Sequence, residues 1–439
     1  MSLLNIGRRV IFWSLDFIKG SPIRKHYHEI EQIISNPNSK KSIERQKELL
    51  INILNHAVYT TPFYHAYKKY SSIKDFPIIK KTVIQNNFDS FKSETYRNKK
   101  QFKVSTSGST GVPFFLFKNQ NKKDRNSADA IYFFKLCGYN IGNRLYELEV
   151  WREHNKKNVL KSWMQNIVQF DITKLTDSKI LMLFNKLEKS KEKITLLGFS
   201  SAFETIAQFI EKTKYSFEKK NISSVIANSE YLNAYTKDTL NKHFKVPVLS
   251  RYSSEEIGII AQQTFKSQNY FIINHASYFL EILNFESETP TKPGELGRIV
   301  ITDLFNFCMP IIRYDTGDAA KIIIDESGVT KFEHIEGRKM DIIYDCEGNM
   351  ISSFIIYTKF YKYYHLLRQY QFIQESEKQY KVKLNVYEKF PFEKELIEDI
   401  KNDFGKNAII SVEYTNEIPP LSSGKRKKVI SHYKKTRFN

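Results

Sequence analysis

The chain is 439 residues long, 41% hydrophobic and 14% aromatic, which excludes a disordered or low-complexity protein and is typical of two or three domains. Its three cysteines lie far apart, so neither a disulfide framework nor a cysteine-based zinc site is expected, and a reducing cytoplasm fits. The 68 basic and 48 acidic residues leave a net charge of +20, which favours anionic partners: nucleotides, phospholipid surfaces, nucleic acid or acidic sugars.

The N-terminal segment has the first clear pattern. Arg8 and Arg9 precede an apolar stretch, residues 10–18, whose spacing predicts a helix with a broad apolar face. The stretch is too short to cross a bilayer and lacks a small-residue cleavage site, so we expect neither a transmembrane helix nor a secretory signal. Two interpretations remain open: a helix docked on the protein body, or a helix in a membrane interface beside basic residues, namely Lys19, Arg24 and Lys25.

The chain then alternates between helices and short strands as far as residue 269. Helical spacing of apolar residues marks 27–60, 126–137, 201–212 and 235–244. A strand, a turn and a second strand are predicted over 100–118, and short apolar strands over 195–199, 224–228 and 246–249. Buried strands that alternate with helices indicate a largely parallel α/β sheet.

The last third of the chain has a different texture. Past residue 270 it is β-rich, with strands expected over 270–274, 278–284 and 297–303. After residue 337 come strands over 369–374 and 380–387, a helix over 392–404 and a strand over 408–414. We therefore predict an α/β protein with a large N-terminal domain of mixed or parallel sheets flanked by helices, residues 1–337, and a small mobile C-terminal α+β domain, residues 338–439.

Five segments carry residues suited to nucleotide chemistry. The first, Val104–Pro113, is rich in Ser, Thr and Gly, so its backbone N–H groups and hydroxyls can enclose a phosphate; it is not a Walker A loop. The second, Ser250–Gly258, follows an apolar strand and places a tyrosine, for stacking on a base, close to carboxylates suited to Mg²⁺. Read alone, the first is also an ordinary turn and the second an acidic helix start.

The other three segments lie further along the chain. Gly294–Asp303 runs into Met309–Asp318, where a carboxylate after a glycine turn can accept two ribose hydroxyls, although Asp is also common in surface turns. Glu336–Asp341 joins the two predicted domains and is a candidate hinge. Ile418–Lys428 carries a Gly-Lys pair that can bring a positive charge into a site, or else begins a solvated basic tail.

The order and spacing of these five segments resemble the adenylate-forming, acyl-activating superfamily, in its phenylacetate–CoA ligase-like branch. The match extends to Phe12–Lys25 and is similar to the CapK-like proteins of polysaccharide gene clusters. The resemblance implies ATP-dependent activation of a carboxylic acid as an acyl-adenylate with release of pyrophosphate. The acyl group then passes to CoA, to an amine on a sugar or amino acid, or to a hydroxyl, in the synthesis of a capsular or O-antigen surface polysaccharide.

The resemblance also implies roles for individual residues. The phosphate loop comprises Thr106, Ser107, Gly108, Ser109, Thr110 and Gly111. Tyr252 is expected to stack on adenine, and the residues that line the nucleotide pocket with it are Ser229, Glu230 and Ser253. Glu256 would hold Mg²⁺, Asp318 would accept the ribose hydroxyls and Arg338 would approach the ribose and phosphate. Lys425 would bridge the carboxylate and the α-phosphate in the transition state.

Two departures and two alternatives accompany this resemblance. Met340 replaces a common hinge Asp, which bears on domain rotation, and Phe114 stands where a polar residue is common. Candidates for the acid pocket are Tyr139, Trp151, His154, Phe199 and Phe203.

The alternatives are an adenylyltransferase that leaves AMP on its product, of the deazaflavin-coenzyme type, and a non-catalytic nucleotide-binding protein. No nucleic-acid-binding motif is visible, and we expect a cytoplasmic protein that contacts the inner face of an anionic membrane.

Overall fold

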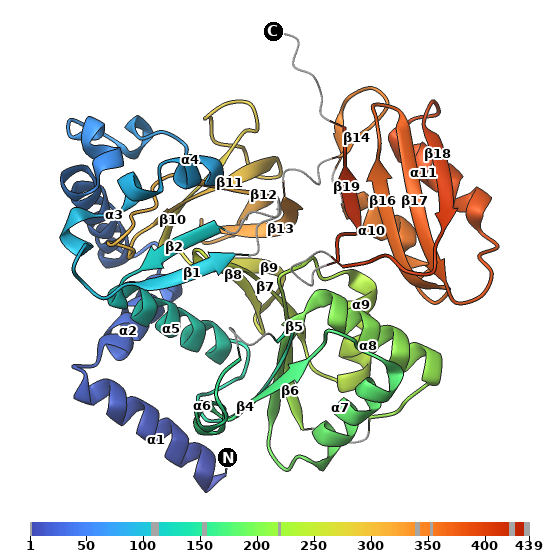
Figure 1. The fold of residues 1–439 in the computed structure, drawn as a ribbon, viewed down its shortest axis with the longest axis horizontal. Helices are drawn as coiled ribbons and strands as arrows, with labels where there is room; N and C mark the ends of the chain where they lie inside the picture. The colour runs from blue at the N-terminus through green and yellow to red at the C-terminus, as the bar shows by residue number, and fades with distance from the viewer. Residues whose placement is uncertain are drawn as a thin grey trace.

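The computed structural model describes residues 2–106, 114–151, 156–217, 221–338, 343–351, 354–420 and 426–433. Figure 1 shows a large lobe built around one long sheet. A smaller lobe, formed by the C-terminal part of the chain, lies beside the large lobe. The sheet of the large lobe has 11 strands in the order β10-β11-β12-β13-β9-β8-β7-β6-β5-β3-β4. The predicted α/β fold with a small C-terminal α+β part is therefore confirmed.

The N-terminal part of the large lobe is helical. Its helices are α1 (Leu3–Ile18), α2 (Pro22–Ser35), α3 (Lys40–Thr60) and α4 (Lys81–Asn86), with 3₁₀ turns at Pro62–Tyr67, Ile73–Asp75, Phe88–Phe91 and Glu94–Tyr96. Proline at the first position suits α2, and the Ser39 side chain accepts a hydrogen bond from the Ser42 amide to cap α3. The single helix expected over 27–60 is thus two helices, and the Pro37–Ser39 stretch separates them.

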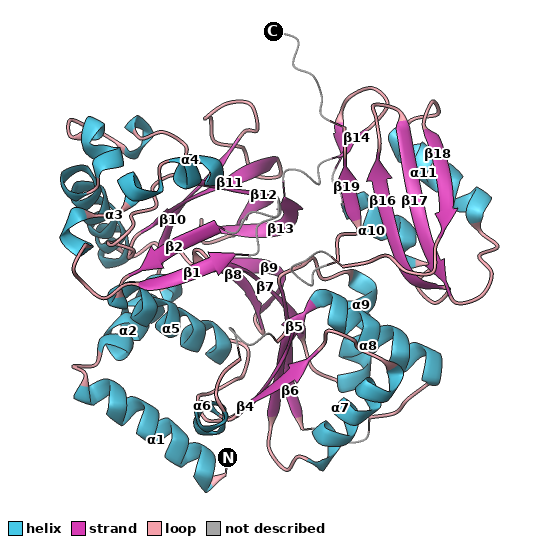
Figure 2. Ribbon diagram, viewed as in Figure 1, coloured by secondary structure: helices cyan, strands magenta, loops and turns pink. Residues whose placement is uncertain are grey.

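One half of the sheet is parallel. Its strands are β3 (Arg144–Glu149), β4 (Ile167–Asp171), β5 (Ile194–Phe199), β6 (Ile222–Asn228) and the start of β7 (Val248–Ser254). The helices between them are α5 (Gln120–Lys135), α6 (Val159–Gln165), α7 (Asp177–Lys189), α8 (Ser200–Thr213) and α9 (Ala234–Phe244). Figure 2 shows α7, α8 and α9 beside these strands. Burial of β5 and β6 on both faces explains why most of their residues are apolar.

The other half of the sheet is antiparallel. It comprises β8 (Gly258–Thr264), β9 (Ser267–Ile273), β10 (Tyr278–Leu283), β11 (Leu296–Asp303), β12 (Tyr314–Ile324) and β13 (Thr330–Arg338). The change occurs within β7, where Val248–Ser250 pair in parallel with β6 and Arg251–Ser254 pair antiparallel with β8. The expectation that this strand ends at Leu249 is wrong, because the chain turns back at Glu255–Ile257 and β8 pairs with the rest of β7.

A separate hairpin carries the predicted phosphate loop. Strands β1 (Phe102–Thr106) and β2 (Phe114–Lys118) pair antiparallel, with Thr106 opposite Phe114, so the two ends of segment 107–113 are adjacent. This confirms the two expected strands, and the turn expected between them lies outside the described residues. Phe114 is 1% exposed and packs in the main core, which explains an aromatic residue at a position where a polar one was anticipated.

The small lobe has its own core. Its four-stranded sheet has the order β18-β17-β16-β19, from Ile409–Tyr414, Gln379–Val386, Leu367–Gln374 and Val429–Ser431. Helices α10 (Phe354–Tyr361) and α11 (Glu393–Phe404) and the short pair β14 (Ile343–Tyr344) and β15 (Met350–Ile351) complete it. The sequence predicted β16, β17, α11 and β18 but not α10 or β19.

Candidate active site

A cluster of two tyrosines and two carboxylates lies where β7 and β12 meet. The Tyr252 hydroxyl donates to Asp318 Oδ2 at 2.6 Å and lies 3.4 Å from Thr316 Oγ1, and the Tyr314 hydroxyl donates to Glu256 Oε1 at 3.3 Å. Strands β8, β9 and β13 separate β7 from β12 in the sheet order. A side-chain contact between β7 and β12 therefore shows that this half of the sheet curls back on itself.

The electrostatics of this cluster favour protonated tyrosines. Burial raises the pKa of Tyr252 well above its ordinary value, and the negative charge of Asp318 raises it further. Burial and then the Glu256 carboxylate do the same to the pKa of Tyr314. Both phenols therefore remain neutral hydrogen-bond donors, and they orient the two carboxylates that were predicted to bind ribose and Mg²⁺.

The other predicted nucleotide residues lie around this cluster. Ser253 is next to Tyr252 in β7, and the backbone of Arg338 at the end of β13 is paired in register with Asp318. Thr106 ends β1. The rest of the predicted loop, residues 107–111, and the catalytic candidate Lys425 lie outside the described residues. The structure thus brings Tyr252, Glu256 and Asp318 together.

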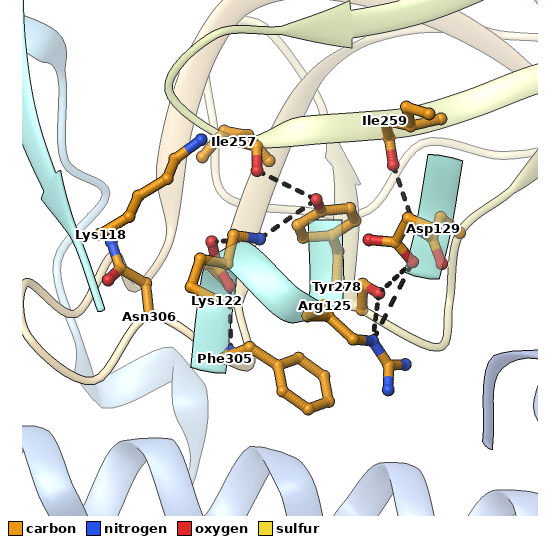
Figure 3. A network of polar contacts seen from close by, with 12 residues as sticks. Lys118, Lys122, Arg125, Asp129, Ile257, Ile259, Tyr278, Phe305 and Asn306 are labelled. Carbon is orange, nitrogen blue, oxygen red and sulfur yellow. Dashed lines mark hydrogen bonds and ion pairs between the residues drawn. The ribbon is translucent and has the colours of Figure 1, made fainter. Parts of the chain in front are cut away.

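A buried polar network holds the turn that carries Glu255 and Glu256 (Figure 3). Lys118 at the end of β2 donates to the Glu255 carbonyl at 2.7 Å, and the Tyr278 hydroxyl donates to the Ile257 carbonyl at 3.1 Å. Lys122 forms an ion pair of 2.7 Å with Asp303, with both side chains at most 1% exposed, and also donates to the Tyr278 hydroxyl at 3.2 Å. Burial, followed by the charge of Lys122, lowers the pKa of Lys118 to about 8.

Gly258 closes this turn and has a positive φ of +126°. A Cβ atom at this position would lie 2.7 Å from the Tyr278 hydroxyl and 2.9 Å from Asn126 Oδ1. Only glycine fits both the backbone conformation and this close approach. Neither Lys118 nor Lys122 was predicted, because a buried lysine is recognisable only when its distant partner is known.

Glu230 connects the two lobes of the molecule. Its carboxylate accepts from the Ser201 amide at the start of α8 at 2.9 Å and from the Arg426 amide of the small lobe at 2.6 Å. Ser229 before it has a left-handed φ of 67°, which turns the chain at the end of β6. Because Arg426 follows Lys425 directly, Glu230 holds the small-lobe chain one residue from the predicted catalytic lysine.

A second set of contacts holds the lobes together along α8 and α9. Lys428 of the small lobe forms an ion pair with Glu204 of α8 and donates to the Tyr364 hydroxyl at 3.1 Å. The Gln208 side chain donates to the Leu367 carbonyl at 3.0 Å, and the Tyr235 and Tyr364 rings stack with centroids 4.5 Å apart. Lys428 and Gln208 therefore form polar contacts across this interface.

Polar groups also gather at the carboxyl ends of the parallel strands. Burial, then the charges of Glu147 and Glu255, raise the pKa of Glu149 to about 7 at the end of β3. Asn228 ends β6 with its side-chain carbonyl buried and unpaired, and the buried Arg251 packs over the Phe134 ring at 4.2 Å. Ligand sites in parallel sheets lie at this end of the strands. None of these polar residues was predicted.

The predicted acid-pocket candidates have different surroundings. Phe203 is fully buried in the core between α8 and the parallel strands, and Tyr139 packs in a neighbouring core cluster. Trp151 donates through its indole N–H to the Glu147 carbonyl at 3.4 Å, and Phe199 directly precedes α8. His154 lies outside the described residues. Trp151 and Phe199 therefore lie nearest the strand ends.

The described residues contain no group of three or more His, Cys, Asp or Glu side chains arranged to hold a metal ion. Mg²⁺ that accompanies a nucleotide commonly takes only one or two protein carboxylates and completes its shell with phosphates and water. Glu256, a carboxylate oriented by Tyr314, fits that pattern.

Comparison with solved structures gives the class of protein. A 2-hydroxyisobutyryl-CoA ligase, solved in the postadenylation state with an acyl-AMP, superposes with a TM-score of 0.71 at 16% identity, covering 89% of this chain and 90% of that one. ATP-bound MatB from Rhodopseudomonas palustris gives 0.55 at 15% identity, covering 74% and 66%. The chain therefore has the fold of the adenylate-forming ligases.

Sequence comparison shows which known proteins this chain is similar to. Residues 343–432 match the model of the CapK C-terminal domain. Protein CapK of Staphylococcus aureus is 23% identical over 83% of this chain and 81% of its own length. The small lobe is thus similar to the CapK C-terminal domain and the whole chain has the fold of the adenylate-forming ligases, which confirms the resemblance drawn from the motifs.

Proposed function

We propose that this protein activates a carboxylic acid with ATP as an acyl-adenylate, releases pyrophosphate and transfers the acyl group to a second substrate. The observation that carries the proposal is the joining of the Tyr252–Asp318 and Tyr314–Glu256 pairs in one cluster, with the Lys425-bearing chain anchored to Glu230. The structural relatives support it, because those proteins were solved with ATP or with acyl-AMP.

The chemistry must bring two anions together, a carboxylate and the α-phosphate of ATP. In the proposal, Tyr252 stacks on adenine, while the Asp318 carboxylate, which the Tyr252 hydroxyl orients, accepts from the ribose hydroxyls. Glu256 holds Mg²⁺, which neutralises phosphate charge, and Thr106–Gly111 surround the β- and γ-phosphates. Lys425 contacts the carboxylate and the α-phosphate, where its charge stabilises the transition state.

Because that lysine belongs to the small lobe, the arrangement of the lobes matters. We place the boundary between residues 337 and 338, just before the last residue of β13. The same CoA ligase superposes with a TM-score of 0.71 in its postadenylation state but 0.59 in its open and thioesterification states. This difference supports a lobe arrangement suited to adenylation, in which the Glu230 contact sets the position of Lys425.

The acceptor and the pathway are the finer part of the proposal. CoA bound to the related ligase supports a CoA acceptor, and the CapK match supports a role in surface-polysaccharide synthesis. The CapK match is also the reason for proposing an amino sugar or an amino acid as the acceptor.

The proposal is tested by a pyrophosphate-release screen of the full chain against sugar acids, hydroxy acids, amino acids and aryl acids. We expect release with at least one class, and loss of release in Lys425→Ala with ATP binding retained, since the lysine contact forms mainly in the transition state. Lys427→Ala is the matched control in the same segment. Unchanged release by Lys425→Ala would refute the role of Lys425, and AMP retained on the product would indicate an adenylyltransferase.

A further inference from the structure

Helix α1 is attached to the protein by its polar side. Its three buried residues are Asn5, Arg8 and Asp16. Asn5 Nδ2 donates to Glu192 at 3.1 Å, Arg8 Nη1 donates to Asn5 Oδ1 at 3.1 Å, and the Asp16 carboxylate accepts from the Ile23 amide that begins α2 at 2.9 Å. At Gly142 a Cβ would lie 2.3 Å from the Asn5 carbonyl, so the helix is tightly seated.

The apolar side of α1 consequently faces outward. The exposed apolar residues of the helix include Leu3, Leu4, Val10, Ile11, Leu15, Phe17 and Ile18, and Leu3, Phe17 and Ile18 are 88%, 72% and 77% exposed. The helix is therefore docked on the body, but through its polar residues, and its apolar face stays exposed. A helix that buries polar groups and exposes apolar ones requires an apolar environment outside the chain.

The short helix α6 extends the same surface. Its exposed residues are Val159 (87%), Leu160 (66%), Trp163 (59%) and Met164 (43%). The Arg8 guanidinium lies 5.4 Å from the Trp163 ring centroid, and Asn166 Nδ2 donates to Asn5 Oδ1 at 3.4 Å, so α6 is joined to α1. Figure 1 shows α6 beside the N-terminal end of α1. We call the exposed apolar residues of these two helices the α1–α6 face.

Basic side chains border the α1–α6 face. Exposed residues of this kind are Lys19, Arg24, Lys156 and Lys161. Burial and then the charge of Lys161 lower the pKa of Lys123, whereas burial and Asp16 raise the pKa of Asp124 against the opposing charge of Lys19. An anionic lipid surface complements this combination of apolar, tryptophan and basic residues, whereas a second copy would bring two chains of charge +20 together.

We propose that the α1–α6 face binds the surface of an anionic phospholipid bilayer, with the apolar residues in the interface and the basic residues at the headgroups. Within the described part of the chain no helix is long and apolar enough to span a bilayer, so the contact is peripheral. It would place the adenylating site beside acceptors carried on a lipid. That last consequence rests on the proposed function, whereas the lipid contact does not.

The test is co-sedimentation of the full chain with vesicles of phosphatidylcholine and phosphatidylglycerol in equal amounts. We expect binding at low salt, weaker binding to pure phosphatidylcholine, and a roughly tenfold loss in Phe17→Ser/Ile18→Ser and in Leu160→Ser/Trp163→Ser. Ile324→Ser/Ile409→Ser, which changes two exposed apolar residues far from the face, is the control. Equal sedimentation of all four proteins, or wild type left in the supernatant, would overturn the proposal.

A second measurement locates the contact. The chain has three tryptophans, and Trp13→Phe/Trp151→Phe leaves only Trp163, whose emission should be quenched by vesicles made with brominated lipid. Absence of quenching in a variant that still sediments would contradict the assigned face. Sedimentation velocity without lipid should give a monomer; a dimer abolished by Phe17→Ser/Ile18→Ser would assign the face to a second copy instead.

Discussion

Replacement of Lys428 by methionine should open the two lobes while leaving each lobe folded. The Lys428 side chain is 15% exposed and that of Glu204 is 11% exposed, and the Lys428 ammonium also lies 4.6 Å from the Tyr370 ring centroid. Loss of one member of a buried pair costs about 3–5 kcal/mol, because the other charge remains desolvated. Opening the interface returns Glu204 to water, so the molecule avoids most of this cost by separating its lobes.

The expected magnitude follows from that cost. A loss of about 3 kcal/mol changes the equilibrium between closed and open lobes by roughly 150-fold, since each 1.4 kcal/mol is about tenfold. Small-angle scattering should show a larger radius of gyration for Lys428→Met than for wild type. Pyrophosphate release should fall, whereas the unfolding temperature of each lobe should change little.

A double-mutant cycle decides whether the pair itself is responsible. Glu204→Leu/Lys428→Met removes both charges and should recover much of the closed form, because an apolar pair at a buried site is often neutral or stabilising. Coupling between the two single changes below about 0.5 kcal/mol would refute the reasoning, since contacting residues in an ion pair should couple more strongly. Lys427→Met is the control in the adjacent position.

Three further predictions concern the site. Asp318→Asn should weaken ATP binding, measured by calorimetry, because the ribose hydroxyls and Tyr252 lose a charged acceptor; an unchanged dissociation constant would contradict the ribose role. Gly258→Ala should lower the free energy of unfolding by about 1–3 kcal/mol through strain at positive φ, with Gly294→Ala, which meets no atom within 4 Å, as the control for backbone strain alone. Because the pKa of Glu149 rises from 4.5 to about 7, the folded state binds more protons than the unfolded state, so stability should fall by about 3 kcal/mol as pH rises through this window. Glu149→Gln should remove this fall when the free energy of unfolding is measured by denaturant melts at a series of pH values. If the free energy of unfolding of this variant depends on pH as in the wild type, Glu149 is not buried.

Local sequence patterns predicted much of the fold. The mainly apolar sequences of β5 and β6 and the spacing of apolar residues in α8 and α9 agree with the structure, because strands buried on both faces and amphipathic helices can be recognised within a few residues. The end of β7 was misplaced because its second half is polar and is held by pairing with β8, which no local pattern reveals. In α1 the apolar pattern was seen, but which face of the helix points toward the body depends on Asn5, whose side chain contacts Glu192 and Asn166 far along the chain.

The residues of the candidate site were assigned through the resemblance of their segments to a known superfamily, and their roles stay predictions. Tyr252, Glu256 and Asp318 stand in recognisable segments, and the structure brings them together. Lys118, Lys122 and Tyr314 could not be predicted, because each is defined by a partner more than fifty residues away. Buried polar groups of this kind carry meaning only once the fold has placed their partners.

In the proposed function, the contact between Glu230 and the Arg426 amide would position the chain beside Lys425 without requiring a particular side chain in the small lobe. One carboxylate oxygen is held by the Ser201 amide, at the N-terminus of α8, so it stays oriented and is favoured by the helix dipole when the lobes part. The other oxygen accepts a backbone amide, that of Arg426, which every residue type except proline provides. The position of the chain beside Lys425 therefore depends on Glu230 and on the backbone, so substitution of Arg426 by alanine should preserve the contact, whereas Glu230→Gln should weaken it by removing a charge-assisted hydrogen bond. Pyrophosphate release by both variants measures this difference, and equal losses would show that the Arg426 side chain, which also donates to the Ile418 carbonyl at 2.9 Å, shapes the segment as much as the backbone contact does.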